Sequence, residues 1–271
     1  TFHSNTLRGI SLAGYGNNIT NNIVYNNDGG IFITKDYNNI SGNIIYGNSG
    51  SGNAGIQVSS NNNTISNNTI YNHTIGISMI TAIHTNITDN RIFNSSSRGI
   101  FVNSGSNNNI IRNNTISQTV TNGIYVTTSS NNIISNNTIN GNISSYGILS
   151  STTYATNNTF SQNIVLGTSG GITTYGIGDT YDNNTLYNNS IGLYFWGDKN
   201  NNVTNNEIFR NTRGIQLQDS NNSLFMNNHV YNNTRDLEIA FVSAYNVTII
   251  NLTFDNPLGN YQNFTKTNLV D

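Results

Sequence analysis

The chain has 271 residues, of which 35% are hydrophobic and only 8% are charged, and its formal net charge is −2. This length allows a sizeable core, while the charged share is about a third of that in ordinary globular proteins. Cysteine is absent, which excludes a disulfide framework and a cysteine metal site. The small net charge gives no basic stripe, so neither nucleic acid nor an anionic membrane surface is expected as a partner.

The chain also lacks the usual targeting signals. No apolar run approaches the roughly 20 residues of a membrane span, and the opening residues TFHSNTLRGI lack the charged start and apolar centre of a signal peptide. We therefore expect no membrane insertion in this segment. Any export signal or anchor is expected to have been removed or to lie outside this chain.

The predicted elements follow a repeat that begins near the N-terminus. Each unit holds two apolar residues five positions apart. In chain order these pairs are Ile19 and Val24, Ile40 and Ile45, Ile65 and Ile70, Ile87 and Ile92, Ile111 and Ile116, Ile134 and Ile139, Phe160 and Val165, Tyr181 and Leu186, Val203 and Ile208, Phe225 and Val230, and Ile249 and Phe254.

A glycine followed by alternating apolar residues comes after most pairs. These glycines recur every 21 to 25 residues, at Gly9, Gly30, Gly55, Gly76, Gly99, Gly123, Gly147, Gly171, Gly192 and Gly214. Such a period, with β-type alternation and no segment at helical spacing, predicts a solenoid of short parallel strands. We expect three strands per coil: one ending at each apolar residue of the pair and one opened by the glycine.

The predicted fold is therefore an all-β, right-handed parallel β-helix of about ten to eleven coils. Residues 1–254 form the single solenoid domain, and residues 255–271 form a C-terminal segment that adds a further coil or an end contact. Coils about 4.8 Å apart would give a rod about 50 Å long. One coil buries too few apolar side chains to fold alone, because full burial of each contributes about 1.5–3 kcal/mol.

Asparagine supplies about one residue in five, and its positions predict a ladder. A carboxamide can bond to the turn backbone and to the same residue in adjacent coils, whereas stacked carboxylates would repel. The column lies three residues after the first apolar residue of each pair, at Asn22, Asn43, Asn68, Asn90, Asn114, Asn137, Asn163, Asn184, Asn206 and Asn228. A second, mixed column marks another corner. A column of aromatic residues is expected to stack on the outside, at Tyr25, Tyr46, Tyr71 and Phe93 and again at Tyr187, Phe209 and Tyr231.

The recurrence of N-x-I-x-x-N-x-I before G-I-x-L, clearest in NTISNNTIYNHTIGISM at residues 63–79, resembles the right-handed parallel β-helix repeat family. That family includes NosD-like proteins and carbohydrate-binding or sugar-hydrolysing modules. The Asn-rich, cysteine-free composition resembles archaeal cell-surface proteins. The resemblance implies the fold but not one function, since the architecture carries lyases, hydrolases, epimerases and adhesins.

One sugar-binding face is predicted on the outside of three successive glycine-led strands. Its rings and amides would stack on sugars and bond to their hydroxyl groups, and it comprises Tyr194, Trp196, Gln216, Gln218 and Glu238. The alternative interpretation is an ordinary solvated wall. We expect no catalytic residues, because no second acid falls beside Glu238 and glycosidases need a carboxylate pair.

No metal site or cofactor is expected. The four histidines fall at different offsets in their coils, which argues against the copper that the NosD name suggests. Calcium needs several oxygen ligands including carboxylates, and the close acidic pair considered for it is Asp179 with Asp182. The sequence N-x-S/T recurs often, and ladder residues would face inward. The exposed corner candidates for N-glycosylation are Asn72, Asn94, Asn188 and Asn232.

Two functions remain open at this point. The first is an extracellular structural protein of a surface layer, sheath, adhesin or filament, N-glycosylated and stacking head to tail with copies of itself, without catalysis. The alternative is a carbohydrate-binding β-helix, or a polysaccharide lyase or glycoside hydrolase, that uses the face around Trp196. A cell-surface or extracellular location fits both.

Overall fold

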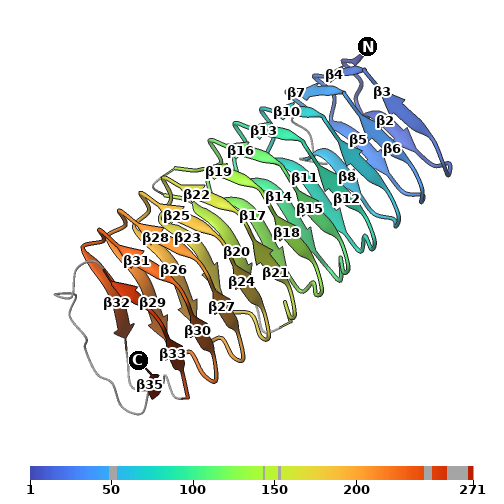
Figure 1. Cartoon of the computed structure of the whole chain (residues 1–271). Helices are drawn as coiled ribbons and strands as arrows, with labels where there is room; N and C mark the ends of the chain where they lie inside the picture. The colour runs from blue at the N-terminus through green and yellow to red at the C-terminus, as the bar shows by residue number, and fades with distance from the viewer. Residues whose placement is uncertain (49–53, 143, 152–153, 241–245, 255–267, 271) are drawn as a thin grey trace.

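The computed structural model is a right-handed parallel β-helix of about eleven turns (Figure 1). It describes residues 1–48, 54–142, 144–151, 154–240, 246–254 and 268–270. Three parallel sheets run the length of the rod, and each coil supplies one strand to each sheet. The predicted fold is confirmed. Within the described residues, no helix is long and apolar enough to span a membrane.

Sheet A has twelve strands, most of them three residues long. They are β1 (Phe2–His3), β4 (Ile23–Tyr25), β7 (Ile44–Tyr46), β10 (Thr69–Tyr71), β13 (Arg91–Phe93), β16 (Thr115–Ser117), β19 (Thr138–Asn140), β22 (Ile164–Leu166), β25 (Thr185–Tyr187), β28 (Glu207–Phe209), β31 (His229–Tyr231) and β34 (Thr253–Phe254).

Sheet B has eleven strands of five or six residues, the longest in the rod. They are β2 (Arg8–Leu12), β5 (Gly29–Ile33), β8 (Ala54–Val58), β11 (Ile75–Ile80), β14 (Arg98–Asn103), β17 (Asn122–Thr127), β20 (Tyr146–Ser151), β23 (Gly170–Thr174), β26 (Ile191–Trp196), β29 (Arg213–Gln218) and β32 (Arg235–Ala240).

Sheet C has twelve strands, and its last strand comes from the C-terminal segment and pairs with β33. They are β3 (Asn18–Thr20), β6 (Asn39–Ser41), β9 (Thr64–Ser66), β12 (Asn86–Thr88), β15 (Ile110–Arg112), β18 (Ile133–Ser135), β21 (Thr159–Ser161), β24 (Thr180–Asp182), β27 (Asn202–Thr204), β30 (Leu224–Met226), β33 (Thr248–Ile250) and β35 (Asn268–Val270).

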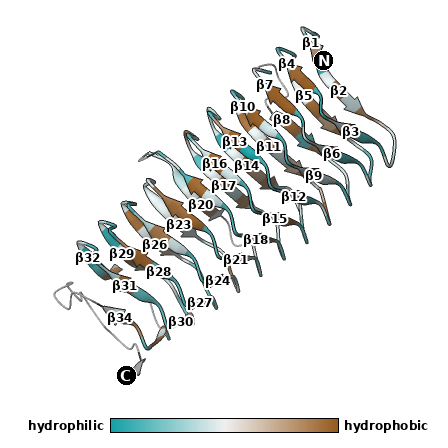
Figure 2. Cartoon of the chain, turned by 45° about the horizontal axis from the view of Figure 1, so that its top comes forward, coloured by the Kyte–Doolittle hydropathy of each residue, from teal (hydrophilic) through white to brown (hydrophobic). Residues whose placement is uncertain are grey.

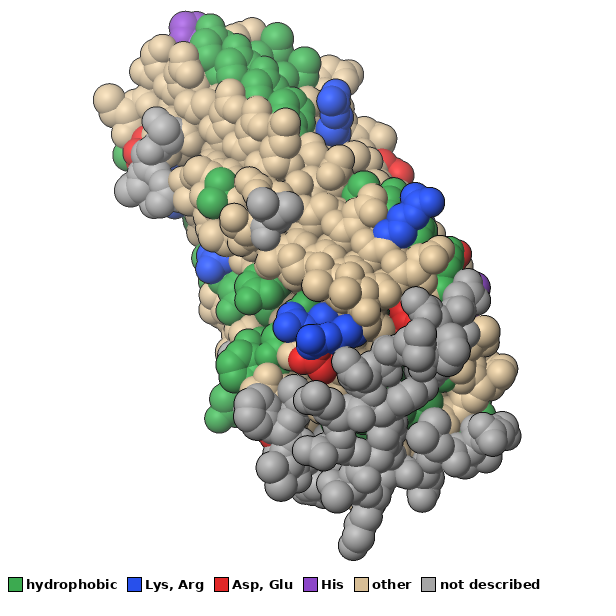
Figure 3. Space-filling view, turned by 90° about the vertical axis from the view of Figure 1, so that its left-hand side faces the viewer, with side chains coloured by type: hydrophobic (Ala, Val, Ile, Leu, Met, Phe, Trp, Pro, Cys, Tyr) green, Lys and Arg blue, Asp and Glu red, His purple; other side chains and the backbone are tan. Residues whose placement is uncertain are grey.

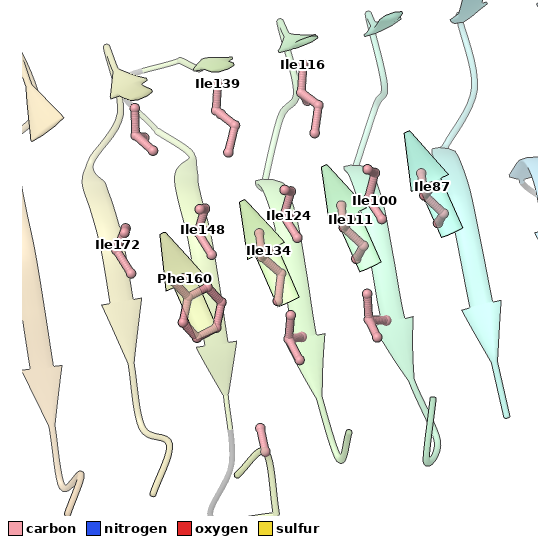
Figure 4. Packing of buried hydrophobic residues seen from close by; sticks show 14 of the residues in the cluster. Ile87, Ile100, Ile111, Ile116, Ile124, Ile134, Ile139, Ile148, Phe160 and Ile172 are labelled. Atoms are coloured by element: carbon pink, nitrogen blue, oxygen red, sulfur yellow. The ribbon is translucent and has the colours of Figure 1, made fainter. Parts of the chain in front are cut away.

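The core is a set of apolar columns inside the rod. In a middle coil the inward side chains are Ile87 on sheet C, Ile92 on sheet A, and Ile100 with Val102 on sheet B, all fully buried. Each stacks on the equivalent residue of the next coil, as Ile87 does on Ile111, and Figure 4 shows these columns side by side. In Figure 2 the most hydrophobic segments lie on strands, and hydrophilic residues occur both on strands and at turns.

The strand boundaries differ slightly from the prediction. Strands of sheets A and C are centred on the apolar residue of the pair, as in Thr64–Ser66 around Ile65, and do not end there. Most strands of sheet B begin one residue before the glycine. The glycine column exists because the coils approach closely: a Cβ on Gly99 would lie 2.6 Å from the backbone oxygen of Gly123.

The predicted asparagine column forms a continuous ladder, here called the first ladder. From Asn43 to Asn228 each side chain is buried, and from Asn43 to Asn206 its Nδ2 donates to Oδ1 of the asparagine in the next coil, as Asn114 does to Asn137 at 3.0 Å. Asn114 Nδ2 also donates to the carbonyl oxygen of Ile87 at 2.9 Å. Asn22 departs from this pattern, because it is only half-buried and its Nδ2 donates to the Thr20 carbonyl oxygen.

Candidate functional site

The outside of sheet B carries one side chain per coil at its centre, and we call this column the outer row. The strand register aligns its members. They are Ser11, Phe32, Gln57, Ser78, Phe101, Tyr125, Leu149, Thr173, Tyr194, Gln216 and Glu238. The inward residues of the last three strands are buried, so the predicted register of this face is correct.

An aromatic cluster lies on this face toward the C-terminal coils. Trp196 is 41% exposed, and its ring centroid lies 5.3 Å from that of Tyr175 and 6.0 Å from that of Tyr194. Partial burial, with the neighbouring tyrosines, raises the pKa of Tyr175 and of Tyr194. Both hydroxyl groups are therefore protonated at neutral pH and can donate hydrogen bonds.

The other residues of the predicted face lie beside this cluster. Gln218 accepts a hydrogen bond from the Tyr194 hydroxyl at 2.8 Å. Gln216 is less available than expected: it is only 9% exposed, and its Oε1 is buried with no hydrogen-bond partner in the described part of the chain. Gln216 lies in the outer row between Tyr194 and Glu238.

Glu238 is held by two arginines. Its Oε2 accepts hydrogen bonds from Nε of Arg213 at 2.8 Å and from Nη1 of Arg235 at 2.9 Å. Partial burial alone would raise the pKa of this carboxyl, but the bonds from Arg235 and Arg213 outweigh burial and lower the pKa. Glu238 is therefore an ionised anchor for two arginines. It is poorly suited to act as a general acid.

A third column of polar side chains also forms a ladder, which was not predicted from the sequence. We call it the third ladder, after the first ladder and the mixed second column. It lies two residues before the first apolar residue of each pair, and its side chains bond to the backbone N–H of the preceding coil, as Asn109 Oδ1 does to Thr85. Its members from the second coil onward are Asn38, Asn63, Thr85, Asn109, Asn132, Asn158, Asp179, Asn201 and Ser223. The repeat N-x-I-x-x-N contained this signal, because its first asparagine is this residue.

The two aspartates that are close in the sequence, Asp179 and Asp182, lie on opposite sides of the coil wall. Asp179 is buried in the third ladder, whereas Asp182 lies on the outer side of β24 and accepts a hydrogen bond from Thr204. Within the described residues, no three His, Asp or Glu side chains are grouped so as to hold a metal ion. His73 is buried at the corner between sheets A and B, and its ring nitrogens contact the carbonyl oxygens of Asn48 and Ile45. The described residues therefore do not fit a copper site.

The predicted aromatic stack lies on sheet A. Ring centroids of Tyr25, Tyr46, Tyr71 and Phe93 follow one another at 5.0, 5.0 and 4.8 Å, nearly parallel. A second stack in the C-terminal half joins Tyr187, Phe209 and Tyr231. These contacts explain the column as packing between coils.

The four proposed glycosylation asparagines share one geometry. Asn72, Asn94, Asn188 and Asn232 are exposed, have φ between 53° and 59°, and directly precede a buried corner residue. The corner before sheet A repeats this arrangement: Asn67, Asn113, Asn136 and Asn183 are also exposed and begin N-N-T sequences. These four residues were not among the predicted sites, because each directly precedes a first-ladder asparagine, and ladder residues were expected to face inward. Modification of all these residues stays a prediction.

Comparison with known protein families gives two matches. The family described as right handed beta helix region matches residues 49–181 and 179–264, and the family described as periplasmic copper-binding protein (NosD) matches residues 1–90. The search of curated proteins finds no match.

Several solved structures share the fold. The mannuronan C-5 epimerase AlgE4 A-module of Azotobacter vinelandii superposes with a TM-score of 0.64 at 11% identity, covering 99% of this chain and 90% of that chain. An alginate lyase from Paenibacillus sp. str. FPU-7 gives 0.55 at 17%, with 92% and 91% covered. The catalytic domain of GH87 α-1,3-glucanase in complex with nigerose gives 0.61 at 15%, with 98% and 64% covered.

Proposed function

Since the chain belongs to the family of right-handed β-helix regions, we propose that it binds a polysaccharide along the outer face of sheet B. The observation that carries this proposal is the cluster of Tyr175, Tyr194 and Trp196 on that face. Exposed aromatic rings with neighbouring hydroxyl and amide groups provide both surfaces that a sugar ring needs, an apolar platform and hydrogen-bonding groups.

The shape of the face suits a polymer. Outward side chains repeat at about 4.8 Å from coil to coil, so a ligand lying along the rod meets a regular series of contacts. The names of the similar solved structures, an epimerase of mannuronan, an alginate lyase and a glucanase, support a carbohydrate ligand. These names support polysaccharide binding better than they support a structural role at the cell surface, which was the first interpretation of the sequence.

Binding is better supported than cleavage. A glycoside hydrolase needs two carboxyl groups at a defined separation. Among the described residues of the outer row, Glu238 is the only carboxylate, and Arg213 and Arg235 both bind it. The same face would nevertheless bring a substrate beside this group. If the protein is an enzyme, we expect a polysaccharide lyase or glycoside hydrolase that acts on a substrate bound to the outer face of sheet B.

Affinity electrophoresis in gels that contain neutral and acidic polysaccharides tests the proposal. At least one polysaccharide should retard the protein, and Trp196→Ala should abolish most of the retardation without changing thermal stability. Tyr37→Ala is the matched control, because Tyr37 is 65% exposed but lies in the turn between β5 and β6, in the N-terminal coils. Equal retardation of both variants, or none for the parent protein, would reject the proposal.

A structural role at the cell surface is the second candidate. The continuous first ladder favours it, since buried hydrogen bonds from Asn43 to Asn228 brace the rod along most of its length. In this role copies of the chain would stack end to end outside the cytoplasm. Sizing and electron microscopy at micromolar concentration test it: filaments would support assembly, and a monodisperse monomer would reject it.

A further inference from the structure

We infer a second binding site on the outer face of sheet B, in the N-terminal coils, that receives a negatively charged unit of the polysaccharide. This inference rests on the proposed function and adds a site and a charge preference to it. The site is an open hollow of about 760 Å³, within the range of ligand sites. Its lining includes Arg8, Asp28, Gln57, Ile75, Ser78 and Phe101.

The outer row produces the hollow. Between Phe32 and Phe101 the row holds Gln57 and Ser78, which are smaller than the rings on either side. The two rings are three coils apart, a distance of about 14 Å. Gln57 and Ser78 thus form a polar floor beside the ring of Phe101, and their amide and hydroxyl groups can bond to sugar hydroxyls.

An arginine stacks on each of these two rings: Arg8 itself lines the hollow, and Arg98 flanks it by stacking on Phe101, which is part of the lining. The guanidinium carbon of Arg8 lies 3.4 Å from the ring centroid of Phe32. That of Arg98 lies 4.3 Å from the centroid of Phe101 and 4.9 Å from that of Tyr125. A planar guanidinium fixed on a ring is preorganised to bind a carboxylate or sulfate through two parallel N–H groups.

Within the described residues no carboxylate forms an ion pair with Arg98, and its Nε is buried without a hydrogen-bond partner. Arg8 and Asp28 both line the hollow and Arg98 flanks it, so the lining and its edge together carry two positive groups and one negative group. Arg213 and Arg235, at the equivalent strand position farther along, are bound to Glu238 instead.

Most arginines of the chain occupy the same position in the repeat. Four of the seven arginines of this weakly acidic chain occupy the same place, the first residue of a sheet B strand, at Arg8, Arg98, Arg213 and Arg235. Figure 3 shows basic side chains as separate groups on a surface of mostly uncharged side chains. The chemistry that fits is a uronic-acid carboxylate or a sulfate ester, with the apolar face of the sugar against Phe101 and Ile75.

Calorimetric titration of the full chain with paired polysaccharides tests the inference. Polygalacturonate is compared with its methyl-esterified form, which masks the carboxylates, and dextran sulfate with dextran. An anionic form should bind at least about tenfold more tightly than its neutral partner. Arg98→Gln should remove most of that difference, Arg98→Lys should retain part of it, and Arg112→Gln on sheet C should leave it unchanged.

The outcomes separate the two proposals. Trp196→Ala should weaken binding of the charged and neutral forms alike, whereas Arg98→Gln should weaken only the charged form. A preference for one anionic polymer alone assigns the site to carboxylate or to sulfate. Equal affinity for the paired forms, or equal effects of Arg98→Gln and Arg112→Gln, would overturn the charged site while leaving the proposed function standing. No binding of any polymer would overturn both.

Discussion

Oδ1 of Asp179 accepts a hydrogen bond from the backbone N–H of Asn158 at 2.8 Å, in a ladder position that asparagine occupies in both neighbouring coils. The second oxygen of Asp179 accepts hydrogen bonds from Ser150 and from the fully buried hydroxyl of Tyr181. Burial raises the pKa of Asp179 to about 7 and that of nearby Asp198 to about 6, because a low-dielectric interior disfavours the charged carboxylate.

These two carboxyl groups predict that stability falls as the pH rises. The folded protein holds protons that the unfolded chain, with a usual pKa near 3.8, has released, so their contribution is present at about pH 4 and lost through pH 6 to 7. Asp179→Asn should therefore raise the free energy of unfolding at pH 8 by about 1 to 3 kcal/mol, with less gain at pH 4. Thermal unfolding across this range measures it.

Asp182→Asn is the control for that experiment, since Asp182 lies on the outer side of β24, next to the same ladder. It should leave the pH profile of unfolding almost unchanged. A profile that is flat for the parent protein, or an Asp179→Asn variant that is less stable at pH 8 than the parent, would show that the Asp179 carboxyl is not held protonated.

The first ladder predicts the cost of losing one amide. Asn114→Leu should lower the free energy of unfolding by about 1 to 3 kcal/mol, because the amide of Asn90 and the carbonyl of Ile87 lose buried partners. Asn202→Leu, at an exposed position of sheet C, should change stability by less than about 0.5 kcal/mol. Urea unfolding of both variants measures the two changes in stability. Similar midpoints would mean that the ladder contributes little.

The close approach of the coils makes a third prediction, about the glycine column. Gly99→Ala should destabilise the rod by about 2 kcal/mol or more, since the new methyl group would lie 2.6 Å from both the Gly123 oxygen and Ile116 Cγ2. At Gly29 a methyl group would meet only the Arg8 side chain at 3.4 Å, so Gly29→Ala should be tolerated. The two melting temperatures provide the test, and equal values would contradict the packing argument.

The repeat made the fold predictable. Paired isoleucines five residues apart and a glycine every 21 to 25 residues leave few alternatives to a three-stranded coil, because each pattern recurs at an inward or closely packed position. The third ladder was harder to recognise. Asparagine is so frequent that a column in which Thr85, Asp179 and Ser223 replace it does not stand out until the register is known.

The candidate face was only partly predictable. Alternation along β26 correctly placed Trp196 outside. The hollow near Arg8 could not be anticipated, because its walls come from coils that lie far apart in the sequence. A signal existed in the tripeptide Arg-Gly-Ile, which recurs at residues 8–10, 98–100 and 213–215. A small net charge concealed this alignment, since total charge says nothing about how arginines are distributed over a surface.

The fluorescence of Trp196 tests the central claim most directly, because Trp196 is the sole tryptophan of the chain and lies in the proposed face. Titration with the polysaccharide that binds best should shift or quench its emission in a saturable way. The resulting Kd should match the one measured by calorimetry, and Tyr175→Ala should weaken it. Saturable binding by calorimetry with no change in Trp196 emission would place the ligand elsewhere and contradict the account.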